Sequence, residues 1–222
     1  MSKKDLYISL ALNFINFVAV IICTIFTFKD GVSELRMFTV QSNIMCGIVA
    51  GIMTVFEILI LLKRKEKLPK WLLTLKMVIN TSVFLTFMVV ALFLGFVAIA
   101  EGYSYFILFR GTNIFFHFLT PVIAVVSFTF FEKTNEIKFK YTFFNLIHMG
   151  LYTIFYVLNV KLELTFNEAI GRYDWYYFFA TGNDFISSLI IIAGLGVTYG
   201  LGFLMWYFNK KLYNRANLLT NE

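Results

Sequence analysis

The chain has 222 residues, of which 59% are hydrophobic and 14% are charged, and its mean hydropathy is +0.78. Soluble domains contain about 45–50% apolar and about 25% charged residues. With 28 phenylalanines and only 2 prolines, a chain of this composition would leave much of its apolar surface wet if it folded in water. The composition therefore excludes an ordinary soluble domain and predicts an integral membrane protein.

Six apolar runs are long enough to cross a bilayer as helices, since roughly 17–25 residues span about 30 Å of hydrocarbon. Each run is continuously apolar and lacks the alternation of a lipid-facing β-strand, which argues against a barrel. The sequence therefore predicts an all-α membrane protein, a bundle of six transmembrane helices that forms one domain over residues 1–222. The runs cover residues 7–28, 37–62, 71–100, 112–131, 141–160 and 183–208.

The basic residues outside these runs predict the orientation of the bundle. Loops on one side together with both tails carry 13 Lys and Arg residues, and the loops on the other side carry 5. Because basic residues favour the cytoplasmic side, we expect both termini to be cytoplasmic. The net charge of +6 follows mostly from this bias, so no nucleic-acid partner is expected. The abundance of Phe, Ile, Lys and Asn suggests a bacterial cell membrane.

Polar side chains gather where three of the runs enter from the outer side. Intramembrane polar groups mark either helix contacts or functional sites. Helical spacing places Thr39 and Asn43 on one face, and Asn113 and His117 on one face of another helix. Thr39 and His117 are expected at the same depth. The gathered residues are Thr39, Gln41, Ser42 and Asn43 in the second run, Thr112, Asn113 and His117 in the fourth, Asn183 and Asp184 in the sixth, and Asp174 just before it.

A hydroxyl and an imidazole at matched depth are the minimum for acyl transfer, with Thr39 as nucleophile and His117 as general base. Oxyanion donors or substrate-positioning residues would come from Asn43, Asn113, Gln41, Ser42 and the free N–H groups of the helix start. Asp184 or Asp174 could orient the imidazole. The alternative from spacing alone is that these side chains only join helices.

Two of these stretches resemble a known family. MFTVQSNIM and NIFFHFLTPVIAVVSFTFFE are similar to the androgen-induced-gene and androgen-dependent TFPI-regulating membrane proteins, and RYDWYYFF resembles an aromatic segment before that family's last helix. The resemblance implies a multi-pass intramembrane threonine hydrolase of fatty acid esters of hydroxy fatty acids. The matching catalytic positions are Thr39 and His117. It implies no cofactor and a lipid substrate from the bilayer.

Three other classes remain open. A transporter is disfavoured because no span carries a charge in its middle, while Glu57 and Lys76 can snorkel or pair near the cytoplasmic ends. A haem or quinone protein would need His117 and His148 at similar depth, whereas His148 is expected on the opposite side, paired with Asn145. A non-catalytic scaffold would use the polar cluster as glue. No metal-ligand cluster or nucleotide motif is present in the sequence, and the sequence predicts no oligomeric state.

Two glycine pairs complete the sequence pattern, Gly47 with Gly51 and Gly196 with Gly200. Glycines four residues apart leave a groove along one face of a helix, so that another helix can approach closely. We expect both pairs to be helix contacts.

Overall fold

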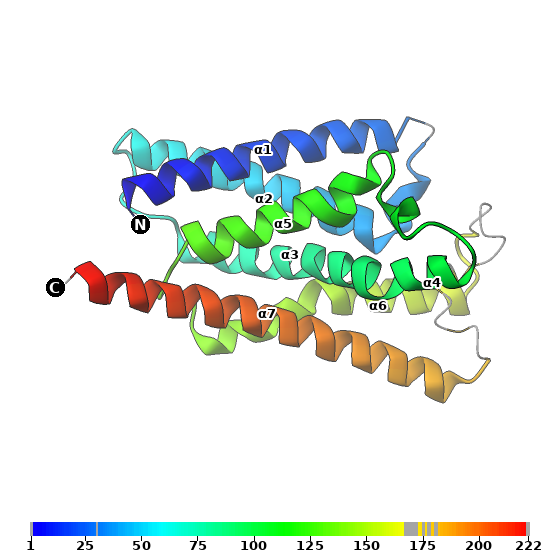
Figure 1. Cartoon of the computed structure of the whole chain (residues 1–222). Helices are drawn as coiled ribbons and strands as arrows, with labels where there is room; N and C mark the ends of the chain where they lie inside the picture. Colours follow the sequence, from blue (N-terminus) through cyan, green and yellow to red (C-terminus); the bar gives the residue numbers. More distant parts are fainter. Residues whose placement is uncertain are drawn as a thin grey trace.

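The computed structural model describes residues 2–29, 31–166, 173–174, 176, 179 and 182–220 (Figure 1). Within these residues the chain is helical and contains no strand, as predicted. Five helical segments are long and apolar enough to cross a membrane, and a sixth apolar segment, Phe115–Phe131, is shorter. The all-helical class and the presence of several membrane-length helices are therefore confirmed.

The long segments agree closely with the apolar runs, except that the last extends well beyond its run. They are α1 (Lys3–Thr27), α2 (Phe38–Leu61), α3 (Lys70–Val89) continued by η2 (Val90–Leu94) and α4 (Gly95–Ala100), η6 (Phe139–Phe144) continued by α6 (Asn145–Lys161), and α7 (Asp184–Thr220). The shorter elements are η1 (Ser33–Arg36), η3 (Tyr105–Phe109), η4 (Phe115–Leu119), α5 (Thr120–Val126) and η5 (Ser127–Phe131).

The fourth apolar run is not a regular α-helix. Its first and last turns, η4 and η5, are π-helical. Pro121 lacks an N–H, so the carbonyl of His117 loses its α-helical partner, and the helix widens just before the proline. A third π turn, η2, interrupts the segment that starts at α3; there the Tyr105 hydroxyl donates to the carbonyl of Ala91 at 2.6 Å. Single π turns occur frequently at functional sites.

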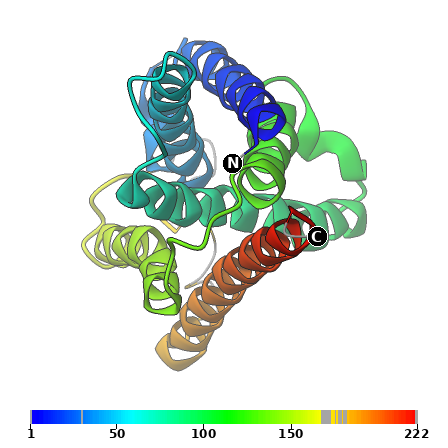
Figure 2. The same cartoon turned by 90° about the vertical axis from the view of Figure 1, so that its left-hand side faces the viewer.

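The helices run roughly along one axis, and both termini lie at the same end of the bundle (Figure 1). We call this the terminal end, where α1 begins and α7 ends, and we call the opposite end, where α2 begins, the distal end. Seen along the axis, α3 lies in the middle, with α1 and α2 on one side and α6 and α7 on the other (Figure 2). The helix α7 crosses obliquely, and its last half lies closest to the other helices.

The distribution of polar residues suits a bundle surrounded by lipid. Large apolar side chains cover the outside, among them Ile25, Phe93 and Leu151, each more than 60% exposed. Inside, nearly as many polar and charged residues as apolar ones are buried. Because lipid drives apolar groups together much less than water does, polar contacts and close packing hold such a bundle. The interior polar groups are therefore the informative part of this fold.

Close approach of α1 and α2 depends on glycine. A Cβ added at Gly47 would lie 2.6 Å from the Val20 side chain, and one at Gly51 would lie 2.8 Å from the Phe17 ring. The first predicted glycine pair is therefore a helix contact. The second is not, because a Cβ at Gly196 or Gly200 would meet nothing within 4 Å among the described residues.

We predict that Gly47→Ala lowers the stability of the folded bundle by about 1–3 kcal/mol, because the methyl group forces α1 away from α2. Gly200→Ala is the matched control: it lies in a helix with open space around it, and alanine favours helix by about 1 kcal/mol over glycine. Thermal unfolding in detergent measures both. Equal melting temperatures for the two variants would contradict the close α1–α2 contact.

Candidate functional site

The distal end begins with an unusual start to α2. Its N-cap residue, Met37, provides no side-chain hydrogen bond. Instead the hydroxyl of Tyr176, from the segment before α7, accepts the N–H of Phe38 at 3.0 Å. Burial raises the pKa of Tyr176, so this hydroxyl stays neutral. The first turn of α2 is thus fixed from outside the helix, and Thr39 lies in that turn.

Thr39 lines an apolar cavity of about 300 Å³, at the lower end of the roughly 300–1,000 Å³ typical of ligand pockets. Within the described residues its hydroxyl makes no hydrogen bond, whereas Thr86, which also lines the cavity, donates to the carbonyl of Ser82 at 3.3 Å. The cavity lies between the start of α2, the α3–η2 segment, α6 and α7. Its apolar walls include Phe38, Leu85, Val89, Val90, Phe93 and Met149.

His117 lies in the π turn η4 and is partly buried. Its Nδ1 is 2.6 Å from the carbonyl of Leu108, and its ring packs edge-on against Phe109. A carbonyl can only accept, so Nδ1 carries the proton and Nε2 keeps its lone pair. This is the tautomer that a general base requires. The partner of Nδ1 is a backbone carbonyl rather than the predicted Asp174 or Asp184.

Asn43 connects the two segments that carry Thr39 and His117. Its Nδ2 donates to the carbonyl of Thr39 at 2.8 Å and to the carbonyl of Phe116 at 3.0 Å, and it is fully buried. The first turn of α2 therefore lies against η4. The side chains of Thr39 and His117 do not hydrogen-bond in this structure, and His117 is not among the residues that line the cavity.

The other predicted site residues have different surroundings. The Nε2 of Gln41 donates to the backbone carbonyl of Leu35 at 2.7 Å. The Ser42 hydroxyl donates to the backbone carbonyl of Thr39 at 3.1 Å. The side chain of Asn113 is exposed. Both hydrogens of the Asn43 amide are also occupied, so Gln41, Ser42 and Asn43 hold the backbone of the site rather than offer free oxyanion donors.

The two predicted carboxylates lie close to the distal end but bind elsewhere. Asp184 forms an exposed ion pair with Lys161 at 2.6 Å. Asp174 accepts the Tyr156 hydroxyl and also the N–H of Phe179, at 2.9 Å. Asp174 therefore orders the segment that supplies Tyr176. The rest of the RYDWYYFF stretch lies largely outside the described residues.

The sequence did not predict a second hydroxyl–imidazole pair. The Nδ1 of His148 lies 2.9 Å from the hydroxyl of Ser82, and its ring stacks on Phe38 with centroids 5.1 Å apart. The expected pairing of His148 with Asn145 is wrong: His148 contacts Ser82, and the side-chain oxygen of Asn145 accepts from Thr81 at 3.2 Å.

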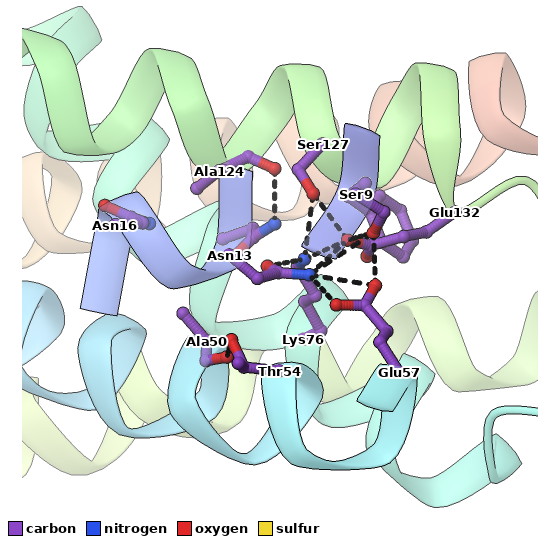
Figure 3. A network of polar contacts seen from close by, with 12 residues as sticks. Ser9, Asn13, Asn16, Ala50, Thr54, Glu57, Lys76, Ala124, Ser127 and Glu132 are labelled. Atoms are coloured by element: carbon purple, nitrogen blue, oxygen red, sulfur yellow. Dashed lines mark hydrogen bonds and ion pairs between the residues drawn. The ribbon is translucent and has the colours of Figure 1, made fainter. Parts of the chain in front are cut away.

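A buried charged cluster near the terminal end joins four helical segments (Figure 3). Lys76 of α3 forms an ion pair with Glu132, which follows η5, and Glu57 of α2 lies beside them; each of the three side chains is at most 2% exposed. Ser9 and Asn13 of α1 bond to both glutamates. Of the two roles expected for Glu57 and Lys76, snorkelling is wrong because both side chains are buried, whereas pairing is confirmed for Lys76, which binds Glu132. These buried charges no longer argue against an ion or proton pathway.

Comparison with protein-family models, with curated proteins and with solved structures finds no match. The resemblance carried by the Thr39 and His117 stretches therefore stays a prediction, and a function must be inferred from the geometry of the two ends of the bundle.

We predict that Asn43→Ala destabilises the protein by about 1–3 kcal/mol, because the carbonyl of Phe116 loses the buried Asn43 donor and the carbonyl of Thr39 keeps only Ser42 as a side-chain donor. Asn113→Ala, an asparagine of the facing segment whose side chain is exposed, should leave the melting temperature unchanged. Thermal unfolding of both purified variants in one detergent makes the comparison. An unchanged melting temperature of Asn43→Ala would show that Asn43 does not hold α2 against η4.

Proposed function

We propose that the protein is a lipid ester hydrolase embedded in a bacterial cell membrane, with Thr39 as nucleophile and His117 as general base. One observation carries the proposal: a threonine hydroxyl without a hydrogen-bond partner in the described chain lines an apolar cavity, in the first turn of a helix. The partial positive charge at a helix N-terminus favours an anion there. An alkoxide or oxyanion formed at Thr39 would gain this stabilisation.

The topology that we propose has six transmembrane helices and both termini in the cytoplasm. The termini lie at one end (Figure 1), which requires an even number of crossings, and Phe115–Phe131 supplies the sixth. The tails and loops assigned to the terminal end carry 13 basic residues, and the loops of the distal end carry 5. This bias agrees with the positive-inside rule. The cavity beside Thr39 then opens in the outer half of the bilayer.

The proposed chemistry proceeds in two halves. Thr39 Oγ1 attacks the ester carbonyl carbon while Nε2 of His117 takes the hydroxyl proton; the alcohol then leaves with that proton, and the acyl group stays on Thr39. Water, deprotonated by Nε2, then attacks the acyl-threonine carbonyl; the bond to Thr39 Oγ1 breaks, Nε2 returns the proton to Oγ1, and the fatty acid is released. The oxyanion is stabilised by those first-turn N–H groups of α2 that have neither a helical partner nor a bond to Tyr176, which excludes the N–H of Phe38. The imidazole must turn toward Thr39 when the substrate binds, and Asn43 keeps the two backbones adjacent.

The cavity supports an acyl substrate. Its walls are almost entirely apolar, so they suit a hydrocarbon chain and offer nothing to a charged one. The resemblance to intramembrane threonine hydrolases indicates esters of hydroxy fatty acids, in which the ester carbonyl lies within a long apolar molecule. We therefore propose these or similar acyl esters as substrates that enter from the bilayer.

We predict that Thr39→Ala abolishes hydrolysis of a fatty acid ester of a hydroxy fatty acid by the purified protein. His117→Ala should lower the rate by at least about 100-fold, the lower range for loss of a general base. Fatty acid release in detergent micelles or liposomes measures both. Thr86→Ala is the matched control, since it removes a hydroxyl from the same cavity and should retain activity. Full activity of Thr39→Ala would disprove the assignment.

A further inference from the structure

The charged cluster at the terminal end does not balance its own charge. It contains two carboxylates, Glu57 and Glu132, and one ammonium, Lys76, all inside the bundle. If all three were ionised, the cluster would carry one net negative charge in the buried interior of the bundle. Burying an uncompensated charge costs several kcal/mol or more, and buried groups usually change protonation instead. The cluster must therefore hold one further positive charge.

The hydrogen bonds lead to the same count. The Ser9 oxygen lies within hydrogen-bond distance of Oε1 of Glu57 and, at 2.8 Å, of Oε1 of Glu132. A hydroxyl has one hydrogen, so it can donate to only one of these oxygens. The other oxygen must donate to Ser9, and a carboxyl group can do this only when it is protonated. Asn13 donates at 3.0–3.1 Å to both glutamates and so holds them together.

Glu132 also has an unused position. Its Oε1 lies within hydrogen-bond distance of Ser9, Asn13, Lys76 and Ser127, whereas Oε2 is buried and has no hydrogen-bond partner in the described chain. The same residue is 1% exposed and borders a cavity of about 410 Å³ that opens at the terminal end. We call this cavity the vestibule. An unpaired carboxylate oxygen beside a polar cavity is where a proton would enter or leave the cluster.

The charged groups around the vestibule leave the cluster's charge unbalanced. Lys133 pairs with Asp5 at 3.2 Å, and Lys67 pairs with Glu136 at 2.8 Å. The Lys67 ammonium holds the pKa of the exposed Glu136 below its ordinary value. The titratable groups that face the vestibule are Asp5 from α1, Glu66 and Lys67 from the α2–α3 loop, Lys133 and Glu136 after η5, and Tyr213 from α7.

We propose that Glu57 and Glu132 form a binding site for one proton, which they share, and that this site exchanges its proton through the vestibule. The ligand is H⁺ rather than a metal ion, because two hydroxyls, one amide and one ammonium already bond to the carboxylates, and only Oε2 of Glu132 has no partner in the described chain. This site lies at the opposite end from Thr39 and does not depend on the proposed hydrolase activity. It gives the protein the kind of group through which membrane proteins move or sense protons.

Infrared spectroscopy of the protein in bilayers tests the proposal, because the C=O stretch of a protonated carboxylic acid is distinct and shifts in D₂O. At neutral pH the difference spectrum of wild type minus Glu57→Gln should contain one such band, and so should that of wild type minus Glu132→Gln. Either change leaves one carboxylate opposite Lys76, so the cluster is neutral without a proton. Glu136→Gln, an exposed glutamate of the vestibule, is the matched control and should retain the band.

Lys76→Met extends the test in the opposite direction. Without the Lys76 ammonium, both carboxylates need a proton, so the carboxylic acid band should double in area. If Lys76→Met does not fold, the two glutamine variants alone decide the proposal. A band that survives either glutamine substitution would overturn the shared site. Absence of the band from the wild-type spectrum would also overturn the proposal. In that case, a higher melting temperature in sodium salt than in choline salt would assign the missing positive charge to a metal cation.

Discussion

The buried contact of Lys76 with Glu132, together with Glu57, Ser9 and Asn13, is the interaction on which the arrangement of this bundle depends. It joins α1, α2, α3 and the end of η5 at one point (Figure 3). Lipid around a bundle drives its helices together far less than water would, so specific polar contacts contribute more to packing. These charges are costly to bury singly and are stable only together. They therefore fix which helices are neighbours, and α3, which carries Lys76, becomes the central helix.

The two ends of the bundle then have different chemistry. The distal end combines an apolar cavity, a helix start and a Thr39 hydroxyl that makes no hydrogen bond to the described residues, which suits an uncharged lipid ester. The terminal end combines ionisable groups with a polar vestibule, which suits a proton. The π turns belong to this division of roles. η2 lines the distal cavity, η4 carries His117, and η5 ends just before Glu132. A π turn thus lies beside the distal cavity, at His117 and next to Glu132, whereas Thr39, Glu57 and Lys76 lie in regular α-helix.

Much of the fold could be predicted from sequence, because lipid requires long apolar helices, and their ends follow from composition. The positions of polar groups within the bundle could not. Glu57 and Lys76 lie near helix ends. There the sequence pattern is the same whether a side chain reaches the surface or turns inward, and only the packing of α1 and η5 against α2 and α3 determines which of the two occurs. The matched depth of Thr39 and His117 was inferred from helical rise; the structure shows that Asn43 joins the carbonyl of Thr39 to that of Phe116 in η4, and it shows no hydrogen bond between the side chains of Thr39 and His117. The pairing of His148 with Ser82 depends on contacts between distant helices, which no local pattern contains.

The most direct test of this account is a double-mutant cycle on the buried ion pair, measured by unfolding of the purified protein in detergent. Lys76→Met alone should lower the free energy of unfolding by about 3–5 kcal/mol, since it leaves carboxylates buried without their ammonium. Combining Lys76→Met with Glu132→Gln should recover most of that loss, because the pair is then removed as a unit. Additive effects of the two substitutions, or a Lys76→Met variant as stable as wild type, would contradict the central role of the cluster.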